Sequence, residues 1–212
     1  MTTEAPSKPK DDWRAARNSF SGRLLTGEQF EDAMAITAVI QREIWKTGTF
    51  KDKLADYAHA FARSERFDAM KAETIVRDLF KERFGETMNQ LRESLLAREQ
   101  TITEADRRQA YTNACGIRNA IENGTKVAFA RAYAFQADDL AATLGITQVT
   151  AKTLMREEFK AAESMELTDW GKDLEARFYR PQIEAETRER EAVRARGEAQ
   201  TASRTRTGPS GP

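Results

Sequence analysis

The chain has little of the two residue types that most often build metal and redox sites. It contains one cysteine, Cys115, and one histidine, His59. A single cysteine forms no internal disulfide, which excludes a disulfide-stapled secreted scaffold and makes a reducing cytoplasm the expected location. One histidine cannot supply a histidine-rich metal site or a bundle with two Glu-x-x-His motifs. We therefore expect no metal and no other cofactor.

Long apolar runs are also absent. The first twelve residues, MTTEAPSKPKDD, are polar and carry prolines where a secretory signal needs an apolar stretch. No later segment approaches the roughly 20 apolar residues of a membrane-spanning helix. The sequence predicts a soluble, cytoplasmic protein with no membrane partner.

Neither sign of charge is in excess, because 34 Lys and Arg are balanced by 34 Asp and Glu. No overall field attracts nucleic acid, so any such attraction must come from a local patch. Hydrophobic residues make up 40% of the 212 positions, which suffices for one large domain or two small ones.

Proline is confined to the ends of the chain, at Pro6, Pro9, Pro181, Pro209 and Pro212. The interior therefore lacks the residue that most disfavours helix, and it is rich in Ala, Glu, Arg, Lys, Leu and Gln. Its apolar residues recur at three and four positions, and no alternating strand pattern persists. The predicted fold class is all-α, a multi-helix bundle.

Residues 12–100 are predicted to form a helical domain that dimerises or binds a partner. Its helices are expected to open at TGEQF (Thr26) and TFKDKL (Thr49), and to continue over FDAMKAETIVRDLFKERFG, which Gly85 ends, and ETMNQLRESLLARE. The expected inward-facing residues are Phe30, Met34, Thr37, Ile40, Ile44, Leu54, Tyr57, Ala58, Phe61, Met70, Val76, Leu79, Phe80, Phe84, Met88, Leu91 and Leu95. No family resemblance covers this half.

Residues 101–182 are predicted to form a second helical domain, after a boundary near residue 100 and a restart at TITEAD. A first helix should bury Tyr111, Ala114, Ile117 and Ile121 and end at ENG, where Asn123 and Gly124 suit a left-handed cap. The apolar segment TKVAFARAYAF should be a buried helix through Val127, Phe129, Tyr133 and Phe135. Near its end, Leu167, Trp170, Leu174 and Phe178 form one stripe, which we expect to close a core and alternatively to dock a partner helix. Gly171 within that stripe allows close approach of a neighbour.

Both ends of the chain are polar. Residues 1–11 and the end from about residue 198 are predicted to be disordered, and residues 183–212 begin as a charged, exposed helix. Arginines of this tail alternate with glutamates at helical spacing, which favours a solvated face over a flexible arm that follows a phosphate backbone.

The stretch DDLAATLGITQVTAKTLM, from Asp138 to Met155, has the spacing of two crossing helices. A helix-turn-helix needs a small residue midway along its first helix, a glycine in the turn and apolar residues around that turn. These roles fit Ala141, Gly145, Leu140, Leu144, Ile146, Ala151 and Leu154. The hydroxyl of Thr147 is placed to cap the second helix.

This stretch resembles the helix-turn-helix families of DNA-binding regulators, and LGITQVTAK is similar to the turn and recognition helix of the sigma-factor region 4 and response-regulator type. The resemblance covers about residues 131–159. It implies double-stranded DNA as the partner, with Gln148 offering an amide to adenine and Val149 a methyl contact to thymine. The implied DNA-binding residues are Thr147, Gln148, Val149, Lys152, Thr153 and Arg156.

Charge in this region departs from a strong DNA binder. Between residues 131 and 160, the four cations Arg131, Lys152, Arg156 and Lys160 meet the four acids Asp138, Asp139, Glu157 and Glu158. Because phosphate neutralisation dominates DNA affinity, the unit should bind weakly without a dimer, the basic tail or a partner. The first hypothesis is a regulatory or accessory DNA-binding protein. The alternative is a helical protein-protein adaptor that binds no nucleic acid, which charge neutrality favours.

An enzyme is not expected. His59 should be a partly buried helix residue beside Asp56, with no nucleophile near it in sequence. Cys115 lies on an apolar stripe, where a small inert hydrophobe is expected; a cysteine nucleophile paired with His59 is the weaker alternative.

Overall fold

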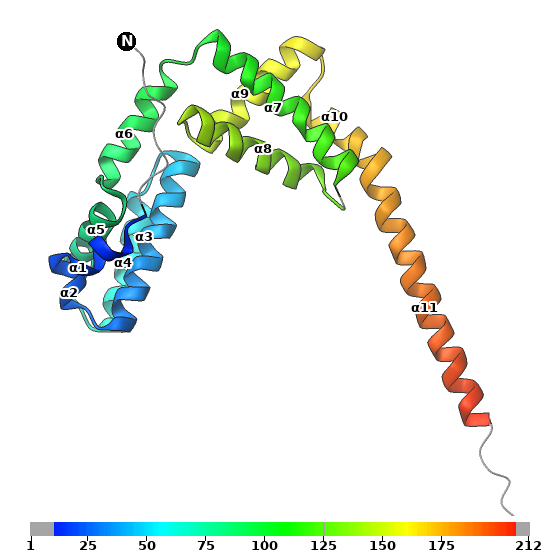
Figure 1. Cartoon of the computed structure of the whole chain (residues 1–212), viewed down its shortest axis with the longest axis horizontal. Coiled ribbons are helices and arrows are strands. Elements are labelled where there is room, and N and C mark those ends of the chain that lie inside the picture. Colours follow the sequence, from blue (N-terminus) through cyan, green and yellow to red (C-terminus); the bar gives the residue numbers. More distant parts are fainter. Residues whose placement is uncertain (1–10, 125, 207–212) are drawn as a thin grey trace, which may run out of the picture. The chain divides into compact units, whose positions relative to one another are not determined.

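The computed structural model describes residues 11–124 and 126–206, and the backbone alone for residues 197–206. Within these ranges all regular elements are helical and no strand occurs, which confirms the predicted all-α class (Figure 1). The disorder predicted for residues 1–10 and 207–212 concerns positions outside the described residues.

The helices follow one another with short connections, as Figure 1 shows. They are α1 (Trp13–Asn18), α2 (Phe20–Leu24), α3 (Gly27–Thr47), α4 (Lys51–Glu65), α5 (Ala69–Phe84), α6 (Met88–Glu99), α7 (Glu104–Asn123), α8 (Phe129–Leu144), α9 (Gln148–Glu163), α10 (Leu167–Leu174), the π-helix η1 (Glu175–Tyr179) and α11 (Arg180–Arg206). The charged helix predicted to begin the tail is α11.

The chain divides into two compact units. Unit 1 comprises residues 1–113 and 137–158, and unit 2 comprises residues 114–136 and 159–212. The sequence suggested a boundary near residue 100, whereas the division passes through α7, α8 and α9. Each of these helices is continuous where it passes from one unit to the other, so no loop marks the division in the sequence.

The core of unit 1 forms around α5, which packs against α1, α3 and α4, while α6 packs against α3. Most of the predicted inward-facing residues are buried there, including Met34, Leu79 and Phe80 at 0% exposure. Tyr57 is an incorrect prediction, at 37% exposure, and so is Met70, of which 80% is exposed. Met70 lies out of phase with the buried stripe of α5, which contains Ala72, Ile75, Val76, Leu79 and Phe80.

Several helix ends follow their predicted signals. Thr26 and Gln29 form a capping box at α3, and Gly85 ends α5 with a left-handed φ of 77°. Thr49 does not open α4: its hydroxyl pairs with that of Thr47 at 2.9 Å, and Phe50, 2% exposed, occupies the N-cap position. Burial of the Phe50 ring outweighs the missing side-chain cap.

Two predictions are wrong here: the left-handed cap after α7 and the burial of Phe135 in α8. α7 ends at Asn123 as expected, but neither Asn123 nor Gly124 adopts a left-handed conformation; instead the backbone of Gly124 lies against Val127. Phe135 is 66% exposed, although its segment was predicted to be a buried helix. The buried stripe of α8 consists of Ala132, Ala137, Leu140, Ala141 and Leu144, and Phe135 lies out of phase with it.

One charged side chain lies inside unit 1. Arg83 is 6% exposed and forms a bidentate ion pair with Asp11, at 2.6 and 3.0 Å. It also donates to the carbonyl of Met34 and the hydroxyl of Thr37. The hydrogen bond from Arg83 lowers the pKa of Asp11 against the opposing effect of desolvation. The buried charge is therefore paired and solvated by the protein.

Candidate nucleic-acid interface

The corner between α8 and α9 is made by a short turn. Gly145 adopts a left-handed φ of 67°, which a glycine reaches without steric cost. Its N–H and that of Ile146 both donate to the carbonyl of Ala141, at 2.9 and 3.1 Å. These bonds satisfy the end of α8 and redirect the chain, so that α9 starts at Gln148.

The packing residues of this corner are those that the spacing predicted. Leu140, Ala141, Leu144, Ile146, Ala151 and Leu154 are all buried, between 0% and 8% exposed, and Met155, which was not predicted, is buried with them. The small side chains of Ala141 and Ala151 allow close approach of neighbouring elements. The sequence pattern thus predicted the interior of the corner correctly.

Thr147 caps α9 from a buried position. Its hydroxyl accepts from the N–H of Thr150 at 3.3 Å, as predicted, but only 3% of the residue is exposed. The N–H and hydroxyl of Thr147 both donate to Glu99 of α6, at 2.9 and 2.6 Å. A Cβ at Gly48, after the end of α3, would lie 3.4 Å from the Thr147 methyl. Thr147 therefore holds the start of α9 and offers little surface to a ligand.

The other predicted contact residues lie along the outer side of α9. Gln148 is half-buried; its amide donates to Asp138 and accepts from Lys152 at 3.1 Å. Val149 is 52% exposed. Thr153 donates to the carbonyl of Val149, and Arg156, which is exposed, donates to Thr153 at 3.5 Å. Val149 and Arg156 are the exposed members of the predicted set, whereas Lys152 and Thr153 are half-buried, as Gln148 is.

Most acids of the corner are engaged by neighbours. Asp138 binds Gln148, and Asp139 accepts from Asn113 at 3.1 Å. Glu158 accepts from Arg107 at 2.7 Å, and this hydrogen bond raises the pKa of Arg107. Glu157 is exposed. Of these four acids only Glu158 is paired with a cation among the described residues; Asp138, Asp139 and Glu157 are exposed and keep the negative charge that the sequence predicted for the corner.

Unit 1 adds side chains that the sequence did not connect with the corner. A cavity of about 340 Å³ is lined by Arg42, Trp45, Lys46, Asp138, Ala141, Ala142 and Gln148. Arg42 and Lys46 are exposed on α3 and Trp45 is half-buried there. About a hundred positions separate α3 from α9, and no local pattern reports such a proximity. The cations nearest to Gln148 in this cavity thus come from α3.

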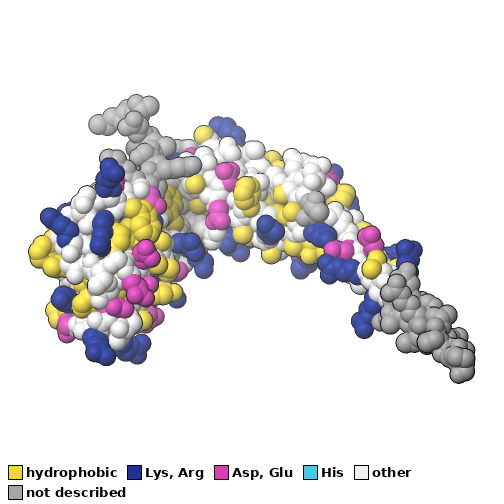
Figure 2. Space-filling view, turned by 60° about the horizontal axis from the view of Figure 1, so that its bottom comes forward, with side chains coloured by type: hydrophobic (Ala, Val, Ile, Leu, Met, Phe, Trp, Pro, Cys, Tyr) yellow, Lys and Arg dark blue, Asp and Glu magenta, His cyan; other side chains and the backbone are white. Residues whose placement is uncertain are grey.

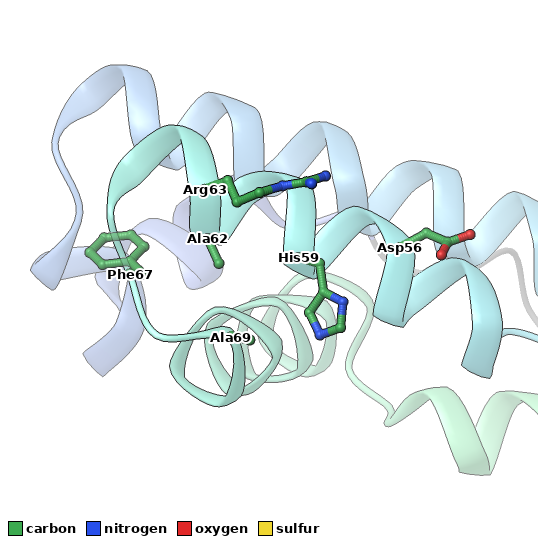
Figure 3. A pocket seen from close by; sticks show the side chains of 6 residues that line it. All are labelled: Asp56, His59, Ala62, Arg63, Phe67 and Ala69. Atoms are coloured by element: carbon green, nitrogen blue, oxygen red, sulfur yellow. The ribbon is translucent and has the colours of Figure 1, made fainter.

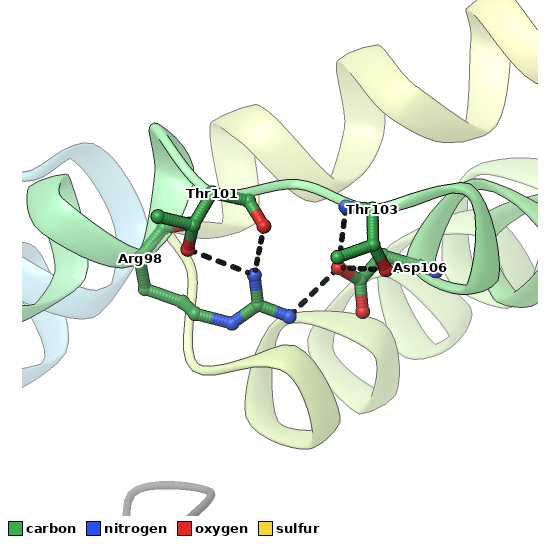
Figure 4. A network of polar contacts seen from close by, with 4 residues as sticks. All are labelled: Arg98, Thr101, Thr103 and Asp106. Atoms are coloured by element: carbon green, nitrogen blue, oxygen red, sulfur yellow. Dashed lines mark hydrogen bonds and ion pairs between the residues drawn. The ribbon is translucent and has the colours of Figure 1, made fainter. Parts of the chain in front are cut away.

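A polar network holds the start of α7 (Figure 4). Asp106 accepts from the N–H and hydroxyl of Thr103 at 2.8 and 2.9 Å, and from Arg98 at 2.8 Å. Desolvation raises the pKa of Asp106, but the hydrogen bonds from Thr103 and Arg98 outweigh it and the pKa is lowered. The network fixes the helix from which Arg107 reaches Glu158 on α9.

Charges on the surface are mixed. On the face in Figure 2, Lys and Arg side chains are interspersed with Asp and Glu and do not collect into one patch. On α11, Arg188 and Arg190 pair with Glu184 and Glu186 one turn earlier. These pairs agree with the solvated helical face that the sequence predicted for the tail.

His59 lies on α4 at the edge of a different cavity of unit 1, about 520 Å³ in volume (Figure 3). Asp56, Ala62, Arg63, Phe67 and Ala69 complete its lining, which contains no serine, threonine, cysteine or lysine. His59 is exposed, so its predicted partial burial is wrong.

Unit 2 combines buried aliphatic side chains with half-buried rings. Leu167 and Leu174 are buried and Trp170 is half-buried, with its ring centroid 4.7 Å from that of Phe159. A Cβ at Gly171 would lie 2.3 Å from the ring of Phe129, so the close approach predicted for this glycine is confirmed. This stripe packs within unit 2.

Cys115 also belongs to unit 2, whereas His59 belongs to unit 1. Cys115 is half-buried and lines a cavity of about 420 Å³ with Arg118, Phe159, Glu163, Met165 and Trp170. Among the described residues, no three His, Cys, Asp or Glu side chains gather in a way that would hold a metal ion.

Over the described ranges, none of the helices combines the length and the apolar character needed to cross a membrane. Comparison of the chain with protein-family models, curated proteins and solved structures gave no match.

Proposed function

We propose that unit 1 binds double-stranded DNA through the α8–α9 corner, with the outer side of α9 in the major groove. The observation that supports this proposal is the division of α9 into two sides. Ala151, Leu154 and Met155 are buried, while Val149 and Arg156 are exposed at positions of the outer side. A helix fixed by its inner side and free on its outer side is the arrangement that groove reading requires.

Each accessible side chain has a partner on DNA. Arg156 and Lys152 can neutralise phosphates or donate to guanine, and Val149 can pack against a thymine methyl. Gln148 can offer its amide to adenine once it leaves Asp138. Thr147 contributes by holding α9 in place through Glu99.

A dimer would raise the affinity of this weakly charged surface. Two copies related by a two-fold axis would present their α9 helices one DNA turn, about 34–36 Å, apart. Exposed apolar side chains suited to such an interface are present on α1 and α2: Trp13, Phe20 and Leu24 are 46%, 74% and 58% exposed. We propose a cytoplasmic regulatory or accessory factor that acts as this dimer.

The test is binding of the full chain to a fluorescein-labelled duplex, followed by anisotropy across a salt series. The double variant Gln148→Ala, Lys152→Ala should lower the affinity at least tenfold, because a bidentate amide and a cation are both removed. The matched control is Gln100→Ala, Lys53→Ala, which changes the same residue types at exposed positions of unit 1. Equal affinity of the two double variants would contradict the proposal.

A second candidate function is protein binding by the same outer side of α9. Two observations favour it: Asp138 engages the amide of Gln148, and Glu157 is exposed beside Arg156. Acids next to the reading residues repel phosphates, whereas a protein partner can pair with them. Absence of duplex binding at low salt would select this alternative.

A further inference from the structure

We infer that the DNA-binding surface of unit 1 extends onto α3, where Arg42 and Lys46 contact backbone phosphates of the duplex. This inference rests on the proposed function and deepens it. It assigns to α3 the cations that the α8–α9 corner lacks.

Arg42 and Lys46 of α3 lie close to the start of α9. Arg42, Trp45 and Lys46 line the same cavity as Gln148, the first residue of α9. A duplex that takes Gln148 into its groove brings phosphates of the groove wall toward the mouth of this cavity. Arg42 and Lys46 are both exposed, so their long side chains can reach such phosphates.

Neither cation is paired with an acid. The side chains of Arg42 and Lys46 form no ion pair or hydrogen bond with any residue that the structure describes. Glu43, between them in sequence, accepts a hydrogen bond from Thr47 on the same helix, and Asp138, the one acid in the lining of the cavity, accepts from Gln148. Two like charges four residues apart weaken a helix slightly, and an anion would relieve that repulsion.

The shape of this cavity also suits a sugar-phosphate chain. Ala141 and Ala142 line its α8 side with small side chains, which leave room for a sugar-phosphate chain. Trp45 packs against the hydrophobic core and holds this part of α3 in place. Positioned cations beside small residues fix the register of a protein on DNA without reading bases.

The experiment compares three full-length proteins on one labelled duplex across a salt series. The test variant is Arg42→Gln, Lys46→Gln. The matched control is Lys53→Gln, Arg63→Gln, which removes one lysine and one arginine from exposed positions of α4 in the same unit. Far-UV circular dichroism of all three proteins verifies that their helix content is equal.

We expect the test variant to bind at least tenfold more weakly than the wild type at moderate salt. The slope of log affinity against log salt should fall by about two, because each lost phosphate contact removes nearly one released counterion. The control should retain the affinity and slope of the wild type to within about one contact.

The outcomes separate this inference from the proposed function. If the wild type binds and the test variant keeps its salt slope, the assignment to α3 is overturned while DNA binding stands. A loss of affinity without a change in slope would overturn it equally, since phosphate contact requires counterion release. If the wild type fails to bind at low salt, the proposed function itself fails and the inference falls with it.

Discussion

Unit 1 and unit 2 differ in how deeply their rings are buried. The interior of unit 1 is closed: Met34, Ile40, Ile44, Leu54, Leu79, Phe80 and Leu95 are at most 1% exposed. In unit 2 the rings of Phe129, Tyr133, Trp170 and Phe178 are only half-buried, and the ring of Phe129 lies against the backbone of Gly171. Unit 1 should therefore be sensitive to removal of volume, and unit 2 to addition of it.

The largest effect is expected from Phe80→Ala in unit 1. The ring is 0% exposed, and its loss should leave a cavity that lowers the free energy of unfolding by about 4 kcal/mol. Urea unfolding followed by Trp45 fluorescence, with Trp13 and Trp170 replaced by Phe, measures the change. As a control in the same unit, Phe20→Ala at a 74% exposed position should cost far less.

Urea unfolding can also test whether the two units unfold independently. In a background where Trp170 is the remaining tryptophan, Phe80→Ala should leave the unfolding of unit 2 nearly unchanged. An equal shift of the Trp170 transition would mean that the two units unfold as one cooperative body.

Gly171→Ala should produce the next largest effect, in unit 2. The new methyl would lie 2.3–2.6 Å from three ring atoms of Phe129, and displacing that ring should cost about 2 kcal/mol. Urea unfolding followed by Trp170 fluorescence is the measurement. Gly27→Ala is the matched control, because a methyl there meets nothing within 4 Å. If both variants are equally stable, close packing at Gly171 does not limit unit 2.

Asp106→Asn should lower the stability of unit 1 by about 1–2 kcal/mol at neutral pH, since a carboxylate that accepts from Thr103 and Arg98 is lost. The pKa of Asp106 is lowered from its ordinary value of 3.8, so its stabilisation is present above about pH 4. The stabilisation should disappear as the pH falls through the lowered folded-state pKa. Unfolding curves of wild type and variant should therefore converge in acid, and a constant difference down to the lowest pH would contradict this assignment.

The smallest effect is expected on binding. Asp138→Asn removes a negative charge beside Gln148 and should strengthen duplex binding about threefold, or about 0.7 kcal/mol. Asp169→Asn, which removes an exposed acid paired with Lys172 in unit 2, should leave anisotropy titrations unchanged. An equal gain in both variants would indicate a net-charge effect, with no special place for the corner.

Local signals in the sequence predicted local structure well. Thr26 with Gln29, Gly85 and Gly145 each act through bonds within a few residues, so their helix ends and turn could be read directly. The stripe through Leu140, Ala141 and Leu144 likewise defined the interior of the corner. Periodicity failed for Met70 and Phe135, because apolar character alone does not show which side of a helix a residue occupies.

What the sequence could not predict depends on contacts between distant segments. Glu99 lies 48 residues from the threonine that it holds, and Arg42 and Lys46 are farther still from α9. The six residues proposed from the motif were chosen as one continuous helix face. Two of them, Val149 and Arg156, are exposed; Gln148, Lys152 and Thr153 are half-buried, and Thr147 is buried.

The anchoring of Thr147 has a consequence for modularity. Because Glu99 of α6 holds both its N–H and its hydroxyl, and the turn after α3 lies against its methyl, the start of α9 is built by three segments of the chain. A fragment limited to α7–α9 would lack two of them, and the Thr147 donors would have to find water instead. The corner therefore depends on α3 and α6 for its structure. Transferring its specificity to another protein would require both helices to be transferred as well.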